Sequence, residues 1–531
     1  MTAAMQEEVK IMGKYESFHF SPENNRSILM PRAPRGTEYH PPKRNRHREL
    51  FPPIPEDKLN HSSPYYQCNL GITEKTIVIN GQERKYAIYV PDGMISKGAG
   101  IFVFPENGTN AEAFIHSENW IALAEKYHTA LVVFESSQWD REQIDKEFDY
   151  AWEIITLEFV QRLTVDICES YMYVMGFGAG AEIAAAFALT YSATFAAFAA
   201  DGNCAVDPEL LEILGKIPSD GDLTLKKTDI AIPGFLIDRS GKAKETFEYM
   251  KTILRAKEEG LANAYGEVYL EQPERGQYYV NAQPVAQAWL GNSESVSEVS
   301  RETLNEEMIK FVLRFSRWGS FGNNCLRPMR TQEEIGVVRV EQIVEGLPRY
   351  WDIYVPSGYR SGDGKKYPLV VAIHGMSCNA EYFERTSDWY RLAEERGFFV
   401  CFASAYPYND GLAKFPVPHW ALESMGVPLH DEVPYFEKML DYMEKIPMVT
   451  AYKLSDGTTT TRFPMGEALD TAQPVVEYLP GWHCDITAAR KWEDLPKEAQ
   501  NYVEYLEKAV GCKITYISVG AEREAYIHHV V

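Results

Sequence analysis

Two short apolar runs, IFVFP at residues 101–105 and LVVFE at residues 131–135, enclose the amphipathic stretch NWIALAEKY at residues 119–127. Continuous apolar runs of about five residues are typical of strands that are buried on both faces of a sheet. A strand, a helix and a second strand in this order indicate a parallel sheet flanked by helices. The sequence therefore predicts an α/β fold.

The same order of segments occurs again further along the chain. The runs LVVAI at residues 369–373 and FVCFA at residues 399–403 enclose DWYRLAEER at residues 388–396. A repeat this long indicates a domain duplication rather than a solenoid of short units. Because each copy is preceded by a probable hairpin, we expect antiparallel strands at one side of each parallel sheet.

Further matches set the extent of the two copies. Tyr89-Val90-Pro91 corresponds to Tyr354-Val355-Pro356, and Ile232–Asp238 corresponds to Leu479–Asp485. The spacing shortens between these matches, so the second copy is predicted to lack a segment. The sequence predicts three parts: an arm of residues 1–70, a domain of residues 71–324 and a domain of residues 325–531.

Composition excludes several classes of partner. The chain has 531 residues, with 53 Lys and Arg against 76 Asp and Glu, and a net charge of −23. A field of this sign repels nucleic acid and anionic lipid, and no apolar run reaches the length of a membrane-spanning helix. Eight cysteines without a CxxC pattern indicate no metal site. We expect a cytoplasmic protein without a signal peptide or a cofactor.

The N-terminal arm differs from the rest of the chain. Residues 31–50, PRAPRGTEYHPPKRNRHREL, are rich in proline and locally basic. Such composition is typical of an extended or disordered segment. A basic arm could also dock on the acidic body of a second copy, so the predicted partner is another copy of this chain, in a homo-oligomer.

Several motifs together resemble a known fold family. They are the Tyr-Val-Pro strands, His374-Gly375 at the end of a buried strand, NAEYF at residues 379–383 and HDEVPYFEKMLDYM at residues 430–443. As a set they resemble the α/β-hydrolase fold, and more narrowly the polyhydroxybutyrate depolymerase and feruloyl esterase branch. The resemblance implies a serine nucleophile on a strand-to-helix turn, a histidine base and an acid that orients it.

In the first copy the resemblance implies a degenerate site. The strand of residues 171–175 runs into Gly176, Phe177, Gly178, Ala179 and Gly180, and Gly178 occupies the position of the serine. Asp238 falls at the position of the acid, but the histidine is absent. An alternative for Gly176–Ala181 is a dinucleotide-binding turn, because G-x-G-x-x-A follows a strand and precedes a helix.

In the second copy the resemblance implies more of the machinery. His374, Gly375 and Met376 would form the oxyanion loop, Asp485 the acid, and His528 or His529 the base. No G-x-S-x-G occurs in the chain, and the closing helix of the first copy has no counterpart in the second. Either the second copy has rearranged or a segment with the nucleophile is missing.

Three functional hypotheses follow from this resemblance. The preferred one is a pseudo-hydrolase that acts in binding or self-assembly. The second is a carboxylic-ester hydrolase that uses the second domain on a small or polymeric ester of the polyester or feruloyl type. The third is dinucleotide binding at Gly176–Ala181.

Overall fold

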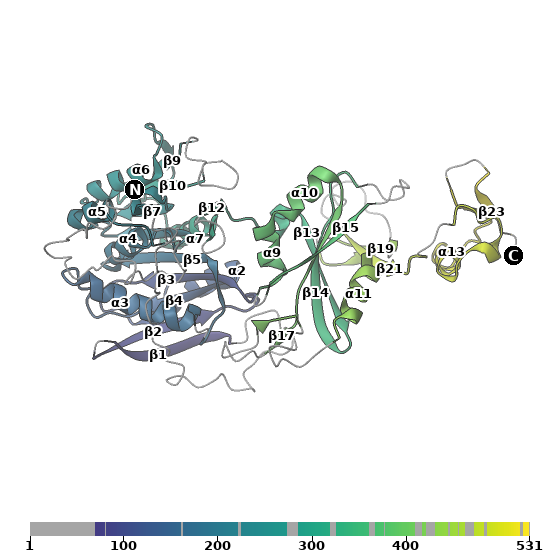
Figure 1. Ribbon diagram of the computed structural model, residues 1–531, viewed down its shortest axis with the longest axis horizontal. Coiled ribbons are helices and arrows are strands. Elements are labelled where there is room, and N and C mark those ends of the chain that lie inside the picture. Colours follow the sequence, from purple (N-terminus) through teal and green to yellow (C-terminus); the bar gives the residue numbers. More distant parts are fainter. Residues whose placement is uncertain are drawn as a thin grey trace, which may run out of the picture. The chain divides into compact units, whose positions relative to one another are not determined.

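The computed structural model describes most of the chain from residue 69 onward. The described residues are 69–79, 81–160, 163–220, 225–272, 285–318, 325–359, 367–375, 378–408, 417–420, 431–443, 446–454, 456–461, 472–482, 486–520 and 524–529. The chain divides into two compact units (Figure 1). The first comprises Met1–Gln342 and Tyr350–Leu429, and the second comprises Ile343–Arg349 and His430–Val531. Residues 1–68 of the predicted arm lie outside the described residues, so its role in self-association stays a prediction.

The first unit contains a ten-stranded mixed sheet in the order β1-β2-β4-β3-β5-β6-β7-β10-β9-β8. Neighbours from β4 to β10 are parallel, and the strands at both ends are antiparallel. The predicted α/β class, with a hairpin beside a parallel sheet, is therefore confirmed. The strands are β1 Gly71–Ile79, β2 Gln82–Val90, β3 Gly98–Phe104, β4 Thr129–Phe134, β5 Ile167–Gly178, β6 Ala197–Gly202, β7 Gly234–Asp238, β8 Leu261–Asn263, β9 Gly266–Leu270 and β10 Gln287–Asn292.

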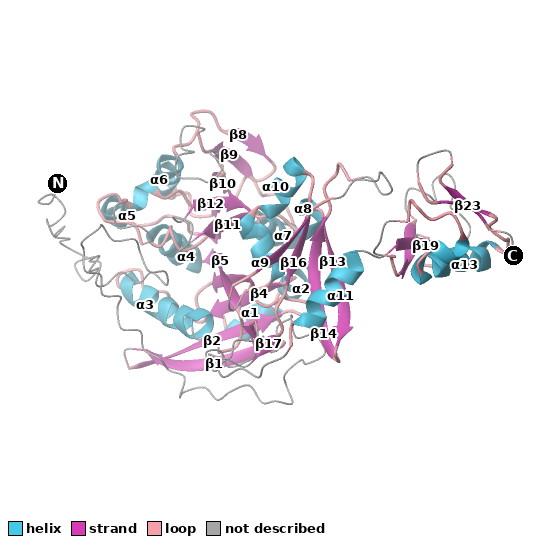
Figure 2. Ribbon diagram, turned by 45° about the vertical axis from the view of Figure 1, so that its right-hand side comes forward, coloured by secondary structure: helices cyan, strands magenta, loops and turns pink. Residues whose placement is uncertain are grey.

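Helices cover both faces of this sheet (Figure 2). One group is connected by contacts of α2 with α1 and α7, and the other by contacts running from α3 through α4 and α5 to α6. This layering is what strands buried on both faces require. The helices are α1 Ala111–His116, α2 Trp120–Tyr127, α3 Ile144–Ile155, α4 Gly180–Thr190, α5 Pro208–Leu214, α6 Lys244–Leu254 and α7 Arg301–Val312.

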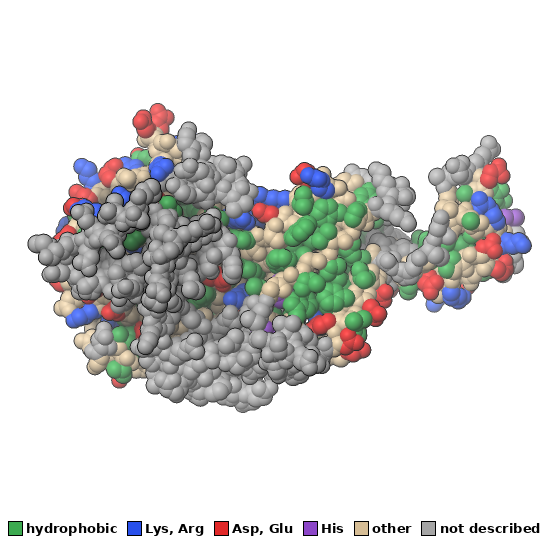
Figure 3. All heavy atoms as spheres, viewed as in Figure 1, with side chains coloured by type: hydrophobic (Ala, Val, Ile, Leu, Met, Phe, Trp, Pro, Cys, Tyr) green, Lys and Arg blue, Asp and Glu red, His purple; other side chains and the backbone are tan. Residues whose placement is uncertain are grey.

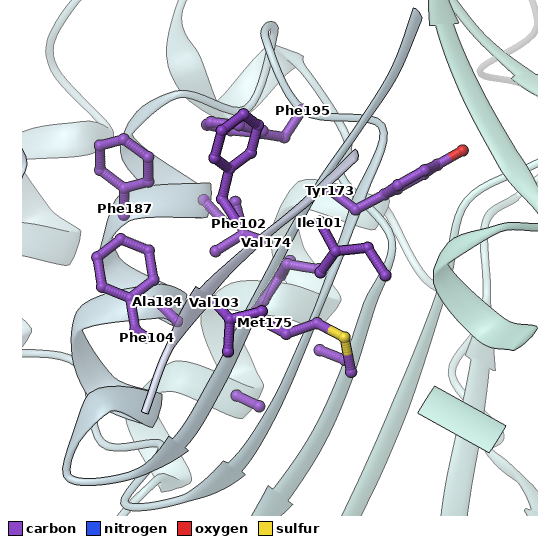
Figure 4. Packing of buried hydrophobic residues seen from close by; sticks show 14 of the residues in the cluster. Ile101, Phe102, Val103, Phe104, Tyr173, Val174, Met175, Ala184, Phe187 and Phe195 are labelled. Atoms are coloured by element: carbon purple, nitrogen blue, oxygen red, sulfur yellow. The ribbon is translucent and has the colours of Figure 1, made fainter. Parts of the chain in front are cut away.

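The core of this unit lies between the central strands and α4 (Figure 4). Phe102 on β3 packs edge-on against Phe195 with ring centroids 6.2 Å apart, and Phe104 lies 5.6 Å from Phe187 of α4. All four rings are fully buried. Burying one such side chain contributes roughly 1.5–3 kcal/mol. The alanines of α4 are equally buried, which allows the helix to lie close to the sheet.

A second sheet in the first unit has the order β13-β14-β16-β15. This order repeats that of the first four strands of the large sheet, β1-β2-β4-β3. In both sets of four, the last two strands (β4 and β3, and β16 and β15) are parallel and are linked by a helix pair. The elements are α8 Gln332–Ile335, β13 Val337–Val344, β14 Leu347–Tyr354, β15 Leu369–Ile373, α9 Ala380–Ser387, α10 Trp389–Arg396 and β16 Phe399–Ala403.

The second sheet differs from the first in ending at β15. In the large sheet the equivalent strand, β3, pairs onward with β5, whereas β15 pairs only with β16 among the described residues. Ile373 on β15 is 50% exposed and Val338 on β13 is 61% exposed. Figure 3 shows a patch of apolar side chains over this part of the chain. The finer prediction of two tandem copies of one hydrolase fold is therefore not confirmed.

The remaining described elements are short hairpins and the second unit. The hairpins of the first unit pair β11 Phe315–Trp318 with β12 Cys325–Pro328, and β17 Pro407–Tyr408 with β18 Val417–Pro418. Among the described residues, no helix is long and apolar enough to cross a membrane. The second unit contains α11 Val433–Met443, β19 Ile446–Lys453, β20 Thr459–Thr460, β21 Gln473–Leu479, a 3-10 turn Trp492–Asp494, α13 Lys497–Val510, β22 Tyr516–Ser518 and β23 Tyr526–His528.

Three buried carboxyl groups lie beside the second sheet with a single arginine. Arg339 donates to both oxygens of Asp352, at 2.9 and 2.8 Å, and also contacts Glu381. Gln332 bridges Asp352 and Glu384 with its amide nitrogen. Burial, and then the charges of Asp352 and Glu381, raise the pKa of Glu384 well above its usual range.

Glu384→Gln tests this arrangement. A carboxyl group whose folded pKa is raised stabilises the fold fully below its unfolded pKa near 4.5, and that contribution is lost as pH rises through the folded pKa. The amide stays neutral, so the variant is expected to gain stability relative to the natural protein as pH rises above 5. Each unit of pKa difference corresponds to ~1.4 kcal/mol. Urea unfolding between pH 5 and 8 measures the difference, and a pH-independent difference would contradict it.

Candidate functional site

The glycine turn after β5 is the first of the predicted sites. Gly178 has φ +57°, in the left-handed region where glycine is favoured. A Cβ at this position would overlap the Glu106 carboxylate. That carboxylate also accepts a hydrogen bond from the Ala179 N–H at 3.1 Å. The space where a side chain at position 178 would project is thus filled by an acidic group.

The other two glycines of the turn allow close packing. A Cβ at Gly176 would lie within 3 Å of Ala181 in α4, and one at Gly180 would overlap the backbone carbonyls of Phe104 and Pro105. Both glycines are buried. The turn therefore serves the packing of α4 on β3 and β5, and its N-terminal N–H at Ala179 is already occupied by a carboxylate. A pyrophosphate group would meet like charge there.

Asp238 lies at the carboxyl end of β7, where its neighbours in the sheet are Gly202 and then Gly178. Its carboxylate accepts hydrogen bonds from the Ser240 hydroxyl at 2.7 Å and from the Ala243 N–H at 3.1 Å. Burial alone would raise the pKa of Asp238, but these hydrogen bonds outweigh it and hold the pKa below its usual range. Asp238 thus stabilises the loop between β7 and α6.

His374 lies in the first unit and is 3% exposed. Its Nδ1 donates to the Gly375 carbonyl at 2.7 Å, and its Nε2 accepts from the Ala405 N–H at 3.0 Å. Burial lowers the pKa of His374 to about 4. Both ring nitrogens are satisfied in the neutral form, so His374 joins the ends of β15 and β16. Met376 lies outside the described residues.

His528 and His529 lie in the second unit, on and after β23. The His528 ring stacks on Tyr516 of β22 with centroids 4.7 Å apart, and the His529 ring stacks on Trp492 at 4.0 Å. Tyr516 also lies 5.7 Å from Tyr526. The two histidines therefore have separate aromatic partners. Asp485, predicted as their acid, lies outside the described residues.

The exposed ring cluster of Tyr516, Tyr526 and His528 rests on a small core. The Tyr516 and Tyr526 side chains are 64% and 46% exposed, whereas Ile527, between Tyr526 and His528 on β23, is 1% exposed. Ile527 belongs to a cluster with Leu495 and Ala499, which lie at the start of α13. Alternation along β23 thus directs one side chain inward and its neighbours to the surface.

Acidic side chains fix the segments around this hairpin. Glu507 on α13 accepts from the Lys513 ammonium at 2.9 Å and from the Ile514 N–H at 2.9 Å. The hydrogen bond from Lys513, followed by that from Ile514, lowers the pKa of Glu507. Asp494 accepts the N–H groups of Arg490 and Lys491. These contacts hold the chain before and after α13 in place.

Comparison with known proteins finds a similarity in this part of the chain. Residues 437–527 match the family model of adenylosuccinate synthetase. An adenylosuccinate synthetase from Acidothermus cellulolyticus is 46% identical over 202 residues, which are 37% of this chain and 41% of that protein. The chloroplastic enzyme of Arabidopsis thaliana is 45% identical over 92 residues, 17% of this chain and 19% of that protein. The chain thus spans less than half the length of these relatives.

Solved structures add no assignment. An acetyl xylan esterase from Aspergillus awamori is 12% identical, covers 41% of this chain and 92% of its own length, and has a TM-score of 0.31. A similarity of that size does not support an argument on fold or function.

The resemblance to hydrolases of the depolymerase and feruloyl esterase branch is therefore wrong as an assignment of this chain. The motif at residues 430–443 overlaps the start of the segment matched to the synthetase family, and Asp485 lies within it. The predicted correspondence of Leu479–Asp485 with Ile232–Asp238 thus has its second member in a segment that matches another family.

The three functional hypotheses fall with that assignment. A pseudo-hydrolase, an ester hydrolase and a dinucleotide-binding protein all place the function in hydrolase-like or Rossmann-like segments, whereas the family match and its relatives lie with adenylosuccinate synthetases. Two structural observations agree with this correction. The Glu106 carboxylate fills the space beside Gly178, and both ring nitrogens of His374 are hydrogen-bonded within the fold.

Sequence reasoning missed two features of these sites. Glu106 directly follows the strand IFVFP, but its position beside Gly178 depends on β3 and β5 being neighbours, which the sequence does not state. The stacking of Trp492 on His529 joins residues far apart in the chain without a motif. The tyrosines of β22 and β23 alternate with apolar residues, and that signal could have indicated an exposed aromatic face.

Gly178→Ala, made with and without Glu106→Ala, tests the account of the turn. The single variant is expected to lower the free energy of unfolding by about 2–3 kcal/mol, because a left-handed conformation and an overlap with Glu106 add together. In the Glu106→Ala background the cost of Gly178→Ala is expected to fall to about 1–2 kcal/mol, since only the backbone strain is left. Urea unfolding of all four proteins measures the coupling. Equal costs in both backgrounds would show that Glu106 does not fill the site.

Proposed function

We propose that the second unit acts as part of an adenylosuccinate synthetase and contributes a surface that contacts the purine nucleotide. The observation that supports this proposal is the family match over residues 437–527, together with 44–46% identity to relatives of that name. The aligned relatives extend well beyond the matched segment, so the proposed role of this unit is one portion of the reaction.

The exposed ring cluster is the surface best suited to a purine. On this hairpin the Tyr516 ring lies 5.7 Å from the Tyr526 ring and 4.7 Å from the His528 ring. A nucleobase that stacks on an aromatic side chain gains ~1–3 kcal/mol. A small core under Ile527 and the contacts of Glu507 hold this hairpin in place without a ligand. Preorganised rings lose little entropy on binding.

Binding of adenylosuccinate to the full chain tests the proposal. Adenylosuccinate is the compound that the relatives' name specifies, and isothermal titration calorimetry measures its Kd directly. Tyr516→Ala is expected to weaken binding about tenfold or more, which corresponds to the loss of one stacking contact. Tyr516→Phe keeps the ring and is expected to bind as the natural protein does.

Two outcomes would overturn the proposal. Absence of heat with the natural chain would exclude adenylosuccinate as a ligand, and equal Kd values for Tyr516→Ala and Tyr516→Phe would exclude the ring cluster as its site. A growth test in cells that lack adenylosuccinate synthetase then asks whether the chain supports the whole reaction or only binds.

A further inference from the structure

A basic cavity in the first unit lies between the β11–β12 hairpin and the helices α9 and α10. Four arginines line it, from three separate segments, and Asp388 is the only acidic side chain among its lining residues. In a chain with a net charge of −23, such a surplus of positive charge is unexpected. The four arginines are Arg327, Arg330, Arg385 and Arg391.

The single carboxylate does not satisfy these arginines. Asp388 lies 3.5 Å from the Arg327 guanidinium and 3.8 Å from that of Arg391, so one acid is shared loosely between two cations. Within the described part of the chain no ion pair is found for Arg330 or Arg385. The Nε groups of Arg327 and Arg385 are buried and have no hydrogen-bond partner among the described residues.

The positions of these arginines are fixed by their surroundings. The Arg327 guanidinium stacks over the Trp318 ring at 4.1 Å, and the Arg385 guanidinium lies 5.6 Å from the centre of the Tyr171 ring. Ser316, which pairs with Arg327 across the hairpin, adds a hydroxyl group to the cavity wall. Stacked guanidinium groups keep their donors in a fixed orientation, which favours planar or tetrahedral oxyanions.

The adjacent acid cluster lies outside the cavity. Burial alone would lower the pKa of Arg385, but the neighbouring Tyr171, Glu384 and Glu381 outweigh it and raise that pKa. Neither of the two glutamates lines the cavity, and Glu381 and Asp352 are engaged with Arg339. Buried donors without a partner are costly, and a bound anion would remove that cost.

The size of the cavity selects a small ligand. Its interior has a volume of about 20 Å³, slightly more than the ~10–15 Å³ that a single water needs. The space that includes the open mouth is about 360 Å³. A compact tetrahedral group would therefore lie at the mouth, with an oxygen atom directed into the interior.

We propose that this cavity binds a phosphoryl group, either as free phosphate or as the phosphate of a small phosphomonoester. Arg385 and Arg327 supply buried Nε donors, and Arg330 and Arg391, also partly exposed, complete the set. The site lies in the first unit and goes beyond the function proposed for the second, so either proposal can fail without the other.

Thermal unfolding of the full chain with inorganic phosphate tests the site. Phosphate at several times its Kd is expected to raise the Tm relative to chloride at equal ionic strength, because a ligand that binds only the folded state stabilises it. The double variant Arg330→Ala/Arg391→Ala is expected to lose this shift. Neither arginine is deeply buried, and Arg330→Ala alone provides a second variant with less risk to folding.

Arg396→Ala is the matched control. Arg396 lies on α10, is paired with Glu395 on the surface and does not line the cavity, so its variant should keep the full shift. Glycerol phosphate in place of phosphate distinguishes the two sources: a larger shift indicates a phosphomonoester, and a shift with inorganic phosphate only indicates the free ion. An equal shift in the double variant, or in chloride, would overturn the proposal.

Discussion

The close approach of α4 to β3 and β5 is the constraint on which the first unit depends. A Cβ on Gly180 would overlap the carbonyl of Phe104 on β3, and a Cβ on Gly176 of β5 would overlap Ala184 of α4. Because α4 is buried on all sides, its position determines how the aromatic side chains of β3 and of the segment after α4 pack. The left-handed turn at Gly178 then follows from the need to reverse the chain over so short a distance.

The same turn shows how far sequence reasoning could reach. Apolar runs with intervening amphipathic stretches predicted the parallel strands and their helices, because periodicity and burial are local properties of the chain. The glycine turn was located correctly between a strand and a helix, and its role as a degenerate nucleophile turn stays a prediction. What occupies the turn is Glu106, which comes from a neighbouring strand, and neighbour relations in a parallel sheet are set by packing across long stretches of sequence.

The second sheet illustrates a different limit. Its strand order repeats that of the first four strands of the large sheet, so the early matches around Tyr89 and Tyr354 reflected a structural likeness. The likeness does not continue, because β15 has no further partner among the described residues and the segment from residue 437 matches another family. A motif as short as Leu479–Asp485 can resemble another segment by chance, even when a true structural likeness precedes it in the chain.

Electrostatics links the two sides of α9 and explains why an acidic chain can maintain a basic cavity. On one side Arg339 is held between Asp352 and Glu381, and burial raises the pKa of the third carboxyl group, that of Glu384. On the other side Arg385 faces a cavity in which cations outnumber acids. The acids that act on Arg385 from within the fold do not line this cavity. The donors that face the cavity are therefore available to an anion from solution.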